Sequence, residues 1–153
     1  MKNERIKPLC TNRKARHSYE ILDTMEAGIM LEGPEVKSLR QGGGSIKDSY
    51  AQVRSGQAWL VHLHISPYVQ AGIFNADPQR IRKILLHKRE IEQLSGKIKE
   101  KGLSLIPLKI YLKGSLIKVE LGLAKGKRAY DKKQTIKERD IKREMERDVK
   151  SWR

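Results

Sequence analysis

Six side chains near the start of the chain have the chemistry needed to contact RNA. They fall within the stretch NRKARHSY, where four basic side chains stand beside an amide and a phenol. Cations contact phosphates, whereas amide, imidazole and aromatic groups read or stack on unpaired bases, and that mixture suits structured RNA. The alternative is a solvated basic segment with the tyrosine in the core. The candidate residues are Asn12, Arg13, Lys14, Arg16, His17 and Tyr19.

The stretch EVKSLR is a second candidate surface, and its pattern predicts a short helix. Val36 and Leu39 are expected in the core, with Glu35, Lys37 and Arg40 on the polar sides. A carboxylate repels phosphate, but it can accept a hydrogen bond from a base amino group or a ribose 2′-hydroxyl. A second role is open to Glu35, because a carboxylate in the first helical turn also stabilises the positive end of the helix dipole.

No set of residues in the sequence indicates catalysis or metal binding. The four histidines are dispersed, the single cysteine cannot complete a zinc site, and no nucleophile–base pair or phosphate-binding loop is recognisable. We therefore expect no cofactor, no metal and no enzymatic activity. A ribosome-associated nuclease is kept only as a weak alternative, which would require metal- or histidine-dependent cleavage of RNA.

The charge balance indicates an anionic partner. The chain has 153 residues, of which 33% are charged and only 38% hydrophobic, and its formal net charge is +15. So large a positive charge opposes compactness and normally serves a nucleic acid or, less often, an acidic membrane surface. With Cys10 as the only cysteine, no signal peptide and no membrane-spanning stretch, the expected location is cytoplasmic.

The composition changes near Leu123–Gly126, which divides the chain into an expected body (residues 1–124) and a basic tail (residues 125–153). The tail holds 12 Lys or Arg and 6 Asp or Glu. Pairs such as Glu138 with Lys142 favour a helix, but the apolar stripe is one residue wide and an isolated helix of this length is marginal. We expect the tail to be disordered when free and helical on a partner. A solvated helix without a role, or a helix lying on a membrane, are the alternatives.

The body has mostly the two-residue period of β-strands. One predicted hairpin joins residues 46–53 and 58–65 through Ser55-Gly56, and another joins residues 103–112 and 116–123. Pro107 indicates an edge strand or a bulge. Trp59 is expected to share its face with Leu63 and to lie in the core, as is Phe74. Both aromatic residues are therefore left out of the candidate site.

Two helices are predicted between the strands. One covers residues 34–41 and ends at the glycine run 42–44; the other ends at Gly102, and its periodicity alone would allow a start at Asp77-Pro78. About six strands with a few short helices indicate a mainly β protein, folded as a small antiparallel barrel.

Seven blocks occur in one fixed order: NRKARHSY, EVKSLR, KDSYA, HISPY, LLHKREI, PLKIY and GKRAYDKK. Together they resemble the bacterial small protein B family, also called the SsrA-binding proteins. The resemblance implies an oligonucleotide-binding (OB) type β-barrel with three helices. It also implies that RKILLH is a strand and that the long helix begins near His87. Members of this family bind the tRNA-like domain of transfer-messenger RNA (tmRNA) and act in trans-translation, which rescues stalled ribosomes.

The resemblance also implies roles for individual residues. It makes Glu35 an RNA contact, beside Lys37, Arg40, Lys125 and Lys127. It places the body in the space of an anticodon arm at the small-subunit decoding centre and the tail in the empty message channel, with elongation factor Tu on the same RNA. The tail residues expected to contact the ribosome are Arg128, Tyr130, Asp131, Lys132, Lys133, Ile136, Lys137, Arg139, Lys142 and Arg143.

A general nucleic-acid packaging protein is the alternative function. Such a protein would bind duplex DNA and RNA alike, because its affinity would come almost entirely from counterion release. A protein that recognises RNA shape would keep its preference for the tRNA-like fold at physiological salt.

Overall fold

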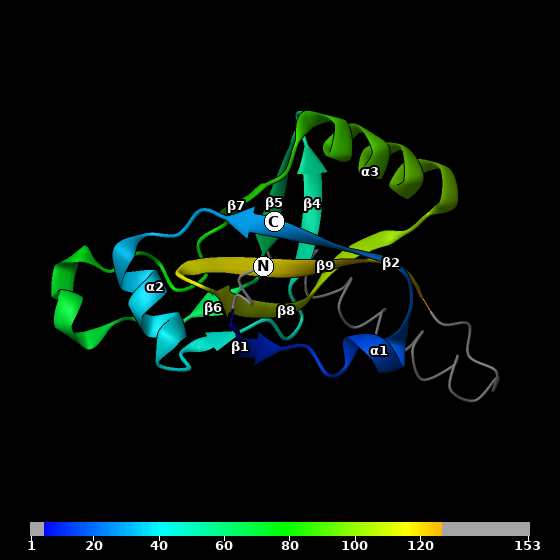
Figure 1. Ribbon diagram of the computed structural model, residues 1–153. Helices are drawn as coiled ribbons and strands as arrows, with labels where there is room; N and C mark the ends of the chain where they lie inside the picture. Colours follow the sequence, from blue (N-terminus) through cyan, green and yellow to red (C-terminus); the bar gives the residue numbers. More distant parts are fainter. Residues whose placement is uncertain (1–4, 127–153) are drawn as a thin grey trace, which may run out of the picture.

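The computed structural model describes residues 5–126 of the chain (Figure 1). The predictions for the tail beyond Gly126, including its helix, fall outside these residues. In order along the chain the elements are β1 (Ile6–Thr11), α1 (Ala15–Ser18), β2 (Tyr19–Ile29), α2 (Gly33–Arg40), β3 (Gly44–Ser45), β4 (Tyr50–Arg54), β5 (Gln57–Val61), β6 (His64–Ile65), η1 (Val69–Phe74), β7 (Arg82–Leu85), α3 (Lys88–Lys101), β8 (Ser104–Lys113) and β9 (Leu116–Gly126).

Seven of these strands form one antiparallel sheet that closes on itself. Their order is β1-β8-β4-β5-β7-β2-β9, and β8 also pairs with β9, so six strands complete a ring with β1 added beside β8. A closed ring leaves few free strand edges and encloses one core. The predicted mainly β, OB-like barrel is confirmed. Figure 1 shows α2 and η1 at one end of the barrel, α1 at the other, and α3 across a third side.

Both predicted hairpins are present, although the first is shorter than predicted, since residues 46–49 lie outside β4 and β5 ends at Val61. Ser55 and Gly56 join β4 to β5 with φ of 53° and 72°, the left-handed pair that a two-residue hairpin turn requires. Strands β8 and β9 form the second hairpin, in which the buried side chains of Val119, Leu121 and Leu123 share one face as predicted. Pro107 marks a bulge and not an edge, because β8 is paired on both sides and its register with β9 shifts after this residue.

The expected core positions of Trp59 and Phe74 are wrong. Ala58 and Leu60 are fully buried, so the residue between them, Trp59, points to the outer face of the barrel, where it is half-buried. The alternation changes phase at His62, whose φ is 65°, and Leu63 then returns to the core. Phe74 lies in η1 with 76% of its surface exposed.

The helix boundaries follow the local sequence. A capping box between Glu32 and Glu35 starts α2, and α3 begins after His87 and ends at Gly102 in the left-handed conformation. The start near His87 and the strand at RKILLH, both implied by the family resemblance, are confirmed. The earlier start at Asp77-Pro78 is wrong, because residues 82–85 form β7. The short elements β1 and α1 were not predicted.

The last two described residues still belong to the sheet. Lys125 and Gly126 pair with Glu20 and Tyr19 of β2, so the barrel continues two residues past the expected boundary at residue 124. None of the helices within residues 5–126 has the length and hydrophobicity to cross a membrane.

Candidate nucleic-acid interface

The segment from Asn12 to Tyr19 forms a basic turn fastened to the barrel. Asn12 Oδ1 accepts a hydrogen bond from the Ala15 amide at 3.2 Å, and its Nδ2 donates to the Pro107 carbonyl at 3.3 Å. Tyr19 is half-buried against the small apolar cluster that includes Ala15. Asn12 and Tyr19 therefore hold the turn in place. The exposed basic side chains of this turn are Arg13, Lys14, Arg16 and His17.

The sheet brings this basic turn beside the end of β9. Tyr19 pairs with Gly126 and Glu20 with Lys125, so Lys125 lies near the end of β9, next to α1. Arg16 lies 4.0 Å from Glu120 but remains 67% exposed, and such a surface pair contributes little stability. The cations of the turn therefore remain available to phosphates, and we call the exposed residues of this turn together with Lys125 the α1 edge.

Helix α2, which carries the two predicted cations, lies at the other end of the barrel (Figure 1). Lys37 and Arg40 are exposed, and Lys37 Nζ stands 5.5 Å from the ring centroid of Tyr68. The structure therefore separates Lys37 and Arg40 from the α1 edge, although the sequence placed both in one RNA-contacting set.

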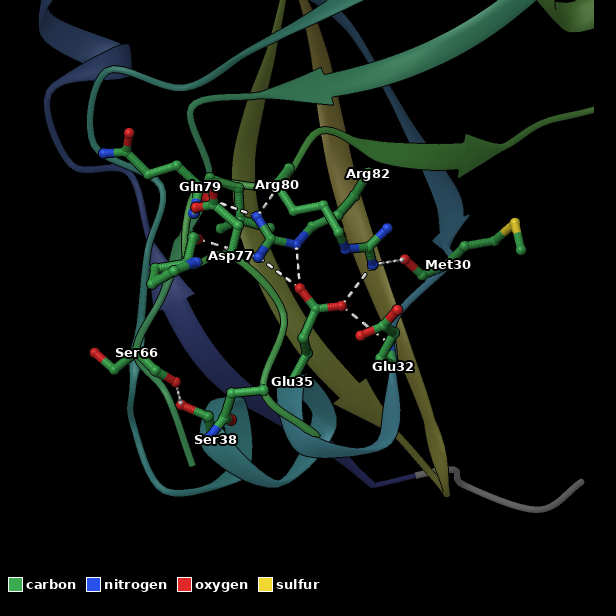
Figure 2. Close-up of polar contacts among 12 residues, drawn as sticks. Met30, Glu32, Glu35, Ser38, Ser66, Asp77, Gln79, Arg80 and Arg82 are labelled. Atoms are coloured by element: carbon green, nitrogen blue, oxygen red, sulfur yellow. Dashed lines mark hydrogen bonds and ion pairs between the residues drawn. The ribbon is translucent and has the colours of Figure 1, made fainter. Parts of the chain in front are cut away.

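Glu35 is not on a polar side of α2, and this prediction is wrong. Its side chain is only 4% exposed, and the carboxylate lies between two guanidinium groups (Figure 2). Arg80 Nη2 donates to Oε1 at 2.6 Å, and Arg82 donates to Oε2 through Nε at 2.7 Å. The Glu32 amide also donates to Oε1 at 2.9 Å. Glu35 therefore has no exposed carboxylate with which to make the RNA contact that the family resemblance implied.

The arginine cluster around Glu35 connects α2 to the segment that leads into β7. Arg82 is fully buried, and its guanidinium donates to the carbonyl oxygens of Leu63, Pro78 and Arg80 at 2.5, 3.1 and 2.8 Å. Burial raises the pKa of the Glu35 carboxyl. Hydrogen bonds from Arg80, the Glu32 amide and Arg82 lower that pKa by more, so it lies below the ordinary 4.5. Glu35 therefore stays ionised and positions α2.

A groove beside the start of α3 was not found from the sequence. It has a volume of about 550 Å³, and its walls come from β2, the β4–β5 turn, β5, β7, β9 and α3. Leu85 is 47% exposed there, and His87 and Lys88 are exposed. The charged and histidine side chains that line it are Glu26, Lys83, His87, Lys88, Glu90 and Lys118.

The acidic side chains of this α3 groove are already partnered. Glu26 accepts a hydrogen bond from the Tyr111 hydroxyl and one at 3.3 Å from Lys113, and these contacts lower the pKa of its carboxyl. Glu90 accepts a hydrogen bond from the His87 amide at 3.0 Å. Lys83, Lys88 and Lys118 thus leave the groove with a positive balance, which suits a phosphate backbone.

Comparison with known proteins identifies the family of this chain. The family described as SmpB protein matches residues 9–151 of the chain. An SsrA-binding protein of Gloeothece citriformis (strain PCC 7424) is 52% identical over 151 residues, covering 98% of this chain and 97% of the relative. The chain belongs to the SmpB family.

Other relatives and a solved structure agree with this assignment to the SmpB family. The SsrA-binding protein of Desulforudis audaxviator (strain MP104C) is 54% identical over 147 residues, or 96% of each chain. That of Staphylococcus aureus (strain Newman) is 54% identical over 143 residues, or 94% of this chain and 93% of the relative. A solved structure described as "tmRNA-SmpB: a journey to the center of the bacterial ribosome" matches with a TM-score of 0.66 and 52% identity, covering 80% of this chain and 87% of that one.

This SmpB-family chain has three exposed candidate surfaces. The α1 edge and the α2 pair Lys37 and Arg40 hold residues predicted from the sequence, whereas the α3 groove holds none of them. Lys127 and the predicted tail residues lie outside the described residues. Within residues 5–126, no three His, Cys, Asp or Glu side chains are grouped closely enough to hold a metal ion. Between them, these surfaces present exposed cationic and imidazole side chains, which have the chemistry for phosphate and base contact.

Proposed function

We propose that this chain binds the tRNA-like domain of tmRNA and delivers it to stalled ribosomes for trans-translation. The observation that carries the proposal is the match, over nearly the whole chain, to relatives named SsrA-binding proteins at 52% and 54% identity. The function is one of binding and delivery, with no catalytic step, and it places the protein in the cytoplasm with the ribosomes.

The body supplies the contacts to the tRNA-like domain. The exposed cations of the α1 edge and the lysines of the α3 groove bind phosphates. The exposed side chains of His17 and His87 donate hydrogen bonds to bases or accept hydrogen bonds from them. A folded RNA is recognised by such separated contacts, because each fixes a different part of its shape. On the ribosome the body occupies the space of an anticodon arm, and elongation factor Tu binds the same RNA.

The tail serves the ribosome step. Residues 125–153 hold twice as many basic as acidic side chains, and β9 ends at Gly126 beside the α1 edge. The tail enters the vacant message channel, where RNA surrounds it and replaces the core that the tail lacks. A channel filled by a message excludes the tail by sterics and charge, so the absence of a message is the condition that the tail senses.

Removing residues 127–153 is expected to leave most of the preference for the tRNA-like domain. The strand β9 stays complete when the chain ends at Gly126, so the α1 edge and the α3 groove are kept. Binding is measured at about 150 mM salt, where nonspecific attraction is partly screened, against an ordinary tRNA and a DNA duplex as competitors. The shortened chain should fail in a ribosome rescue assay that the full chain supports.

Circular dichroism of the shortened chain controls for its folding. If the shortened chain folds but loses the preference, the division between body and tail is wrong. If the competitors displace the tRNA-like domain from the full chain equally well, the packaging function is favoured instead.

A further inference from the structure

Trp59 lies on the outer face of the barrel among residues that suit a nucleotide. The register of the sheet places Gln52 of β4 directly opposite Trp59 on one side and Lys83 of β7 on the other. Directly opposed residues of antiparallel strands share a face, with Cβ atoms about 4.5–5.5 Å apart. Trp59 is therefore flanked on the outer face by Gln52 of one neighbouring strand and Lys83 of the other.

A groove of about 460 Å³ opens over this indole. Its lining residues are Gln52, Arg54, Ser55, Gln57, Trp59 and Ile81. The lining holds one guanidinium, two amides, a hydroxyl and an aromatic ring, and no carboxylate. An aromatic ring stacks on a base, amides form hydrogen bonds with base edges, and a guanidinium binds phosphate. Charge and chemistry in this groove thus match one unpaired nucleotide.

The Trp59 groove continues into the α3 groove. Gln57 lines both, and Lys83, the cross-strand neighbour of Trp59, lines the α3 groove. A phosphate backbone held by Lys83, Lys88 and Lys118 thus passes next to the indole. Because the two grooves share Gln57, a single strand or an unstacked loop of the same RNA can reach both of them.

The exposed apolar side chains of η1 do not offer the same chemistry. Val69, Ile73 and Phe74 are 87%, 93% and 76% exposed, but η1 contains no cationic side chain and Gln70 is its one amide. Phe74 is therefore a matched control for Trp59, because it is an accessible aromatic residue elsewhere on the protein.

We propose that Trp59 stacks on an unpaired nucleotide of the RNA held in the α3 groove, with Arg54 and Lys83 binding its phosphates and Gln52 contacting the base edge. The identification of that RNA as the tRNA-like domain of tmRNA rests on the proposed function. The stacking site adds base stacking to an interface whose other proposed contacts are ion pairs with phosphates and hydrogen bonds from His17 and His87 to base edges.

Fluorescence of Trp59 gives a direct test of stacking. The full chain is prepared with Trp152→Phe, which leaves Trp59 as the only tryptophan. The tRNA-like domain and a uridine hexamer should each quench its emission, because a stacked base quenches an indole. Inorganic polyphosphate, which binds the same cations but carries no base, should leave the emission nearly unchanged. Equal quenching by polyphosphate would overturn the inference.

Affinity gives the second test, with two variants of the full chain that have the same charge. Trp59→Leu should bind the tRNA-like domain about fivefold or more weakly than the native chain, the range expected for loss of one stacked base. Phe74→Leu should bind like the native chain. If circular dichroism shows that Trp59→Leu is folded and this variant binds as tightly as Phe74→Leu, the inference is overturned whatever the fluorescence shows.

The two proposals fail in different ways. If the native chain binds an ordinary tRNA as tightly as the tRNA-like domain, the proposed function fails, while the uridine hexamer still decides whether Trp59 stacks. If the native chain keeps its preference but shows no quenching and no weakening in Trp59→Leu, only the stacking site is overturned.

Discussion

Replacing Glu35 by glutamine is expected to destabilise the protein by about 3–5 kcal/mol, because it leaves a buried charge without its partner. Arg82 has no exposed surface, and in the native chain it donates to Glu35 Oε2 at 2.7 Å through Nε. A guanidinium stays protonated in proteins and cannot adapt by losing its charge. Since most domains are stable by only about 5–15 kcal/mol, urea unfolding should show this loss clearly.

Glu92→Gln is the matched control, because Glu92 is exposed on α3 and undergoes the same chemical change. Its free energy of unfolding should stay within about 0.5 kcal/mol of the native value. Unfolding free energies that agree between Glu35→Gln and Glu92→Gln would show that the cluster around Glu35 does not hold α2 in place.

The contribution of Glu35 to the free energy of unfolding should also depend on pH. Its pKa in the folded protein lies below the ordinary 4.5, so between these two values the unfolded chain binds more protons than the folded one. Stability therefore rises with pH in that window, and the contribution of Glu35 is fully present above 4.5. The difference in unfolding free energy between the native chain and Glu35→Gln should thus shrink as the pH falls through and below the folded pKa.

The position of Glu35 also explains one limit of prediction from sequence. Its place in the first turn of α2 follows from local signals, and the capping interaction with Glu32 is the dipole role that the sequence left open. The arginines that bury it come from residues 80 and 82, on a different segment of the chain. A helical pattern cannot show that a charged side chain will bind two arginines from a distant segment. In the sequence, a carboxylate that becomes buried therefore has the same pattern as an exposed one.

Trp59 illustrates a second limit. The period of two predicted both hairpins, but it was carried through His62 as if the backbone there were extended, whereas β5 ends at Val61. One residue in the left-handed conformation shifts the alternation of buried and exposed side chains by one position. Trp59 therefore lies on the outer face and not on the core face that it was expected to share with Leu63. Local turn signals such as Ser55-Gly56 were sufficient to predict the hairpins. No such signal in the sequence marks His62 as a residue with positive φ.

The α3 groove could not be predicted for a related reason. Its lysines stand at positions 83, 88 and 118, and only the antiparallel pairings of β7 with β2 and of β2 with β9 bring their strands together. By contrast, the cations at residues 13–17 of the α1 edge could be proposed from the sequence because they lie within one short stretch; Lys125 joins them only through the pairing of β9 with β2. Contacts that are local in sequence were therefore found, and those made by barrel closure were not.

Neutralising the three lysines of the α3 groove is expected to weaken binding to the tRNA-like domain by about 10- to 100-fold at physiological salt, since each phosphate left without its lysine keeps its counterions. The variant carries Lys83→Gln, Lys88→Gln and Lys118→Gln in the full chain. The slope of log K against log salt should become shallower by about 2, at roughly 0.7–0.9 for each phosphate that the protein no longer neutralises.

The matched control removes the same charge from the far end of the same helix. Lys97, Lys99 and Lys101 are exposed near the C-terminus of α3 and do not line the groove. Their triple replacement by glutamine also lowers the net charge by three, so it reports the effect of overall charge alone. Urea unfolding of both variants separates weakened binding from impaired folding. If both variants weaken binding equally, the RNA responds to the total charge of the protein and not to the groove, and the α3 groove is then not an RNA site.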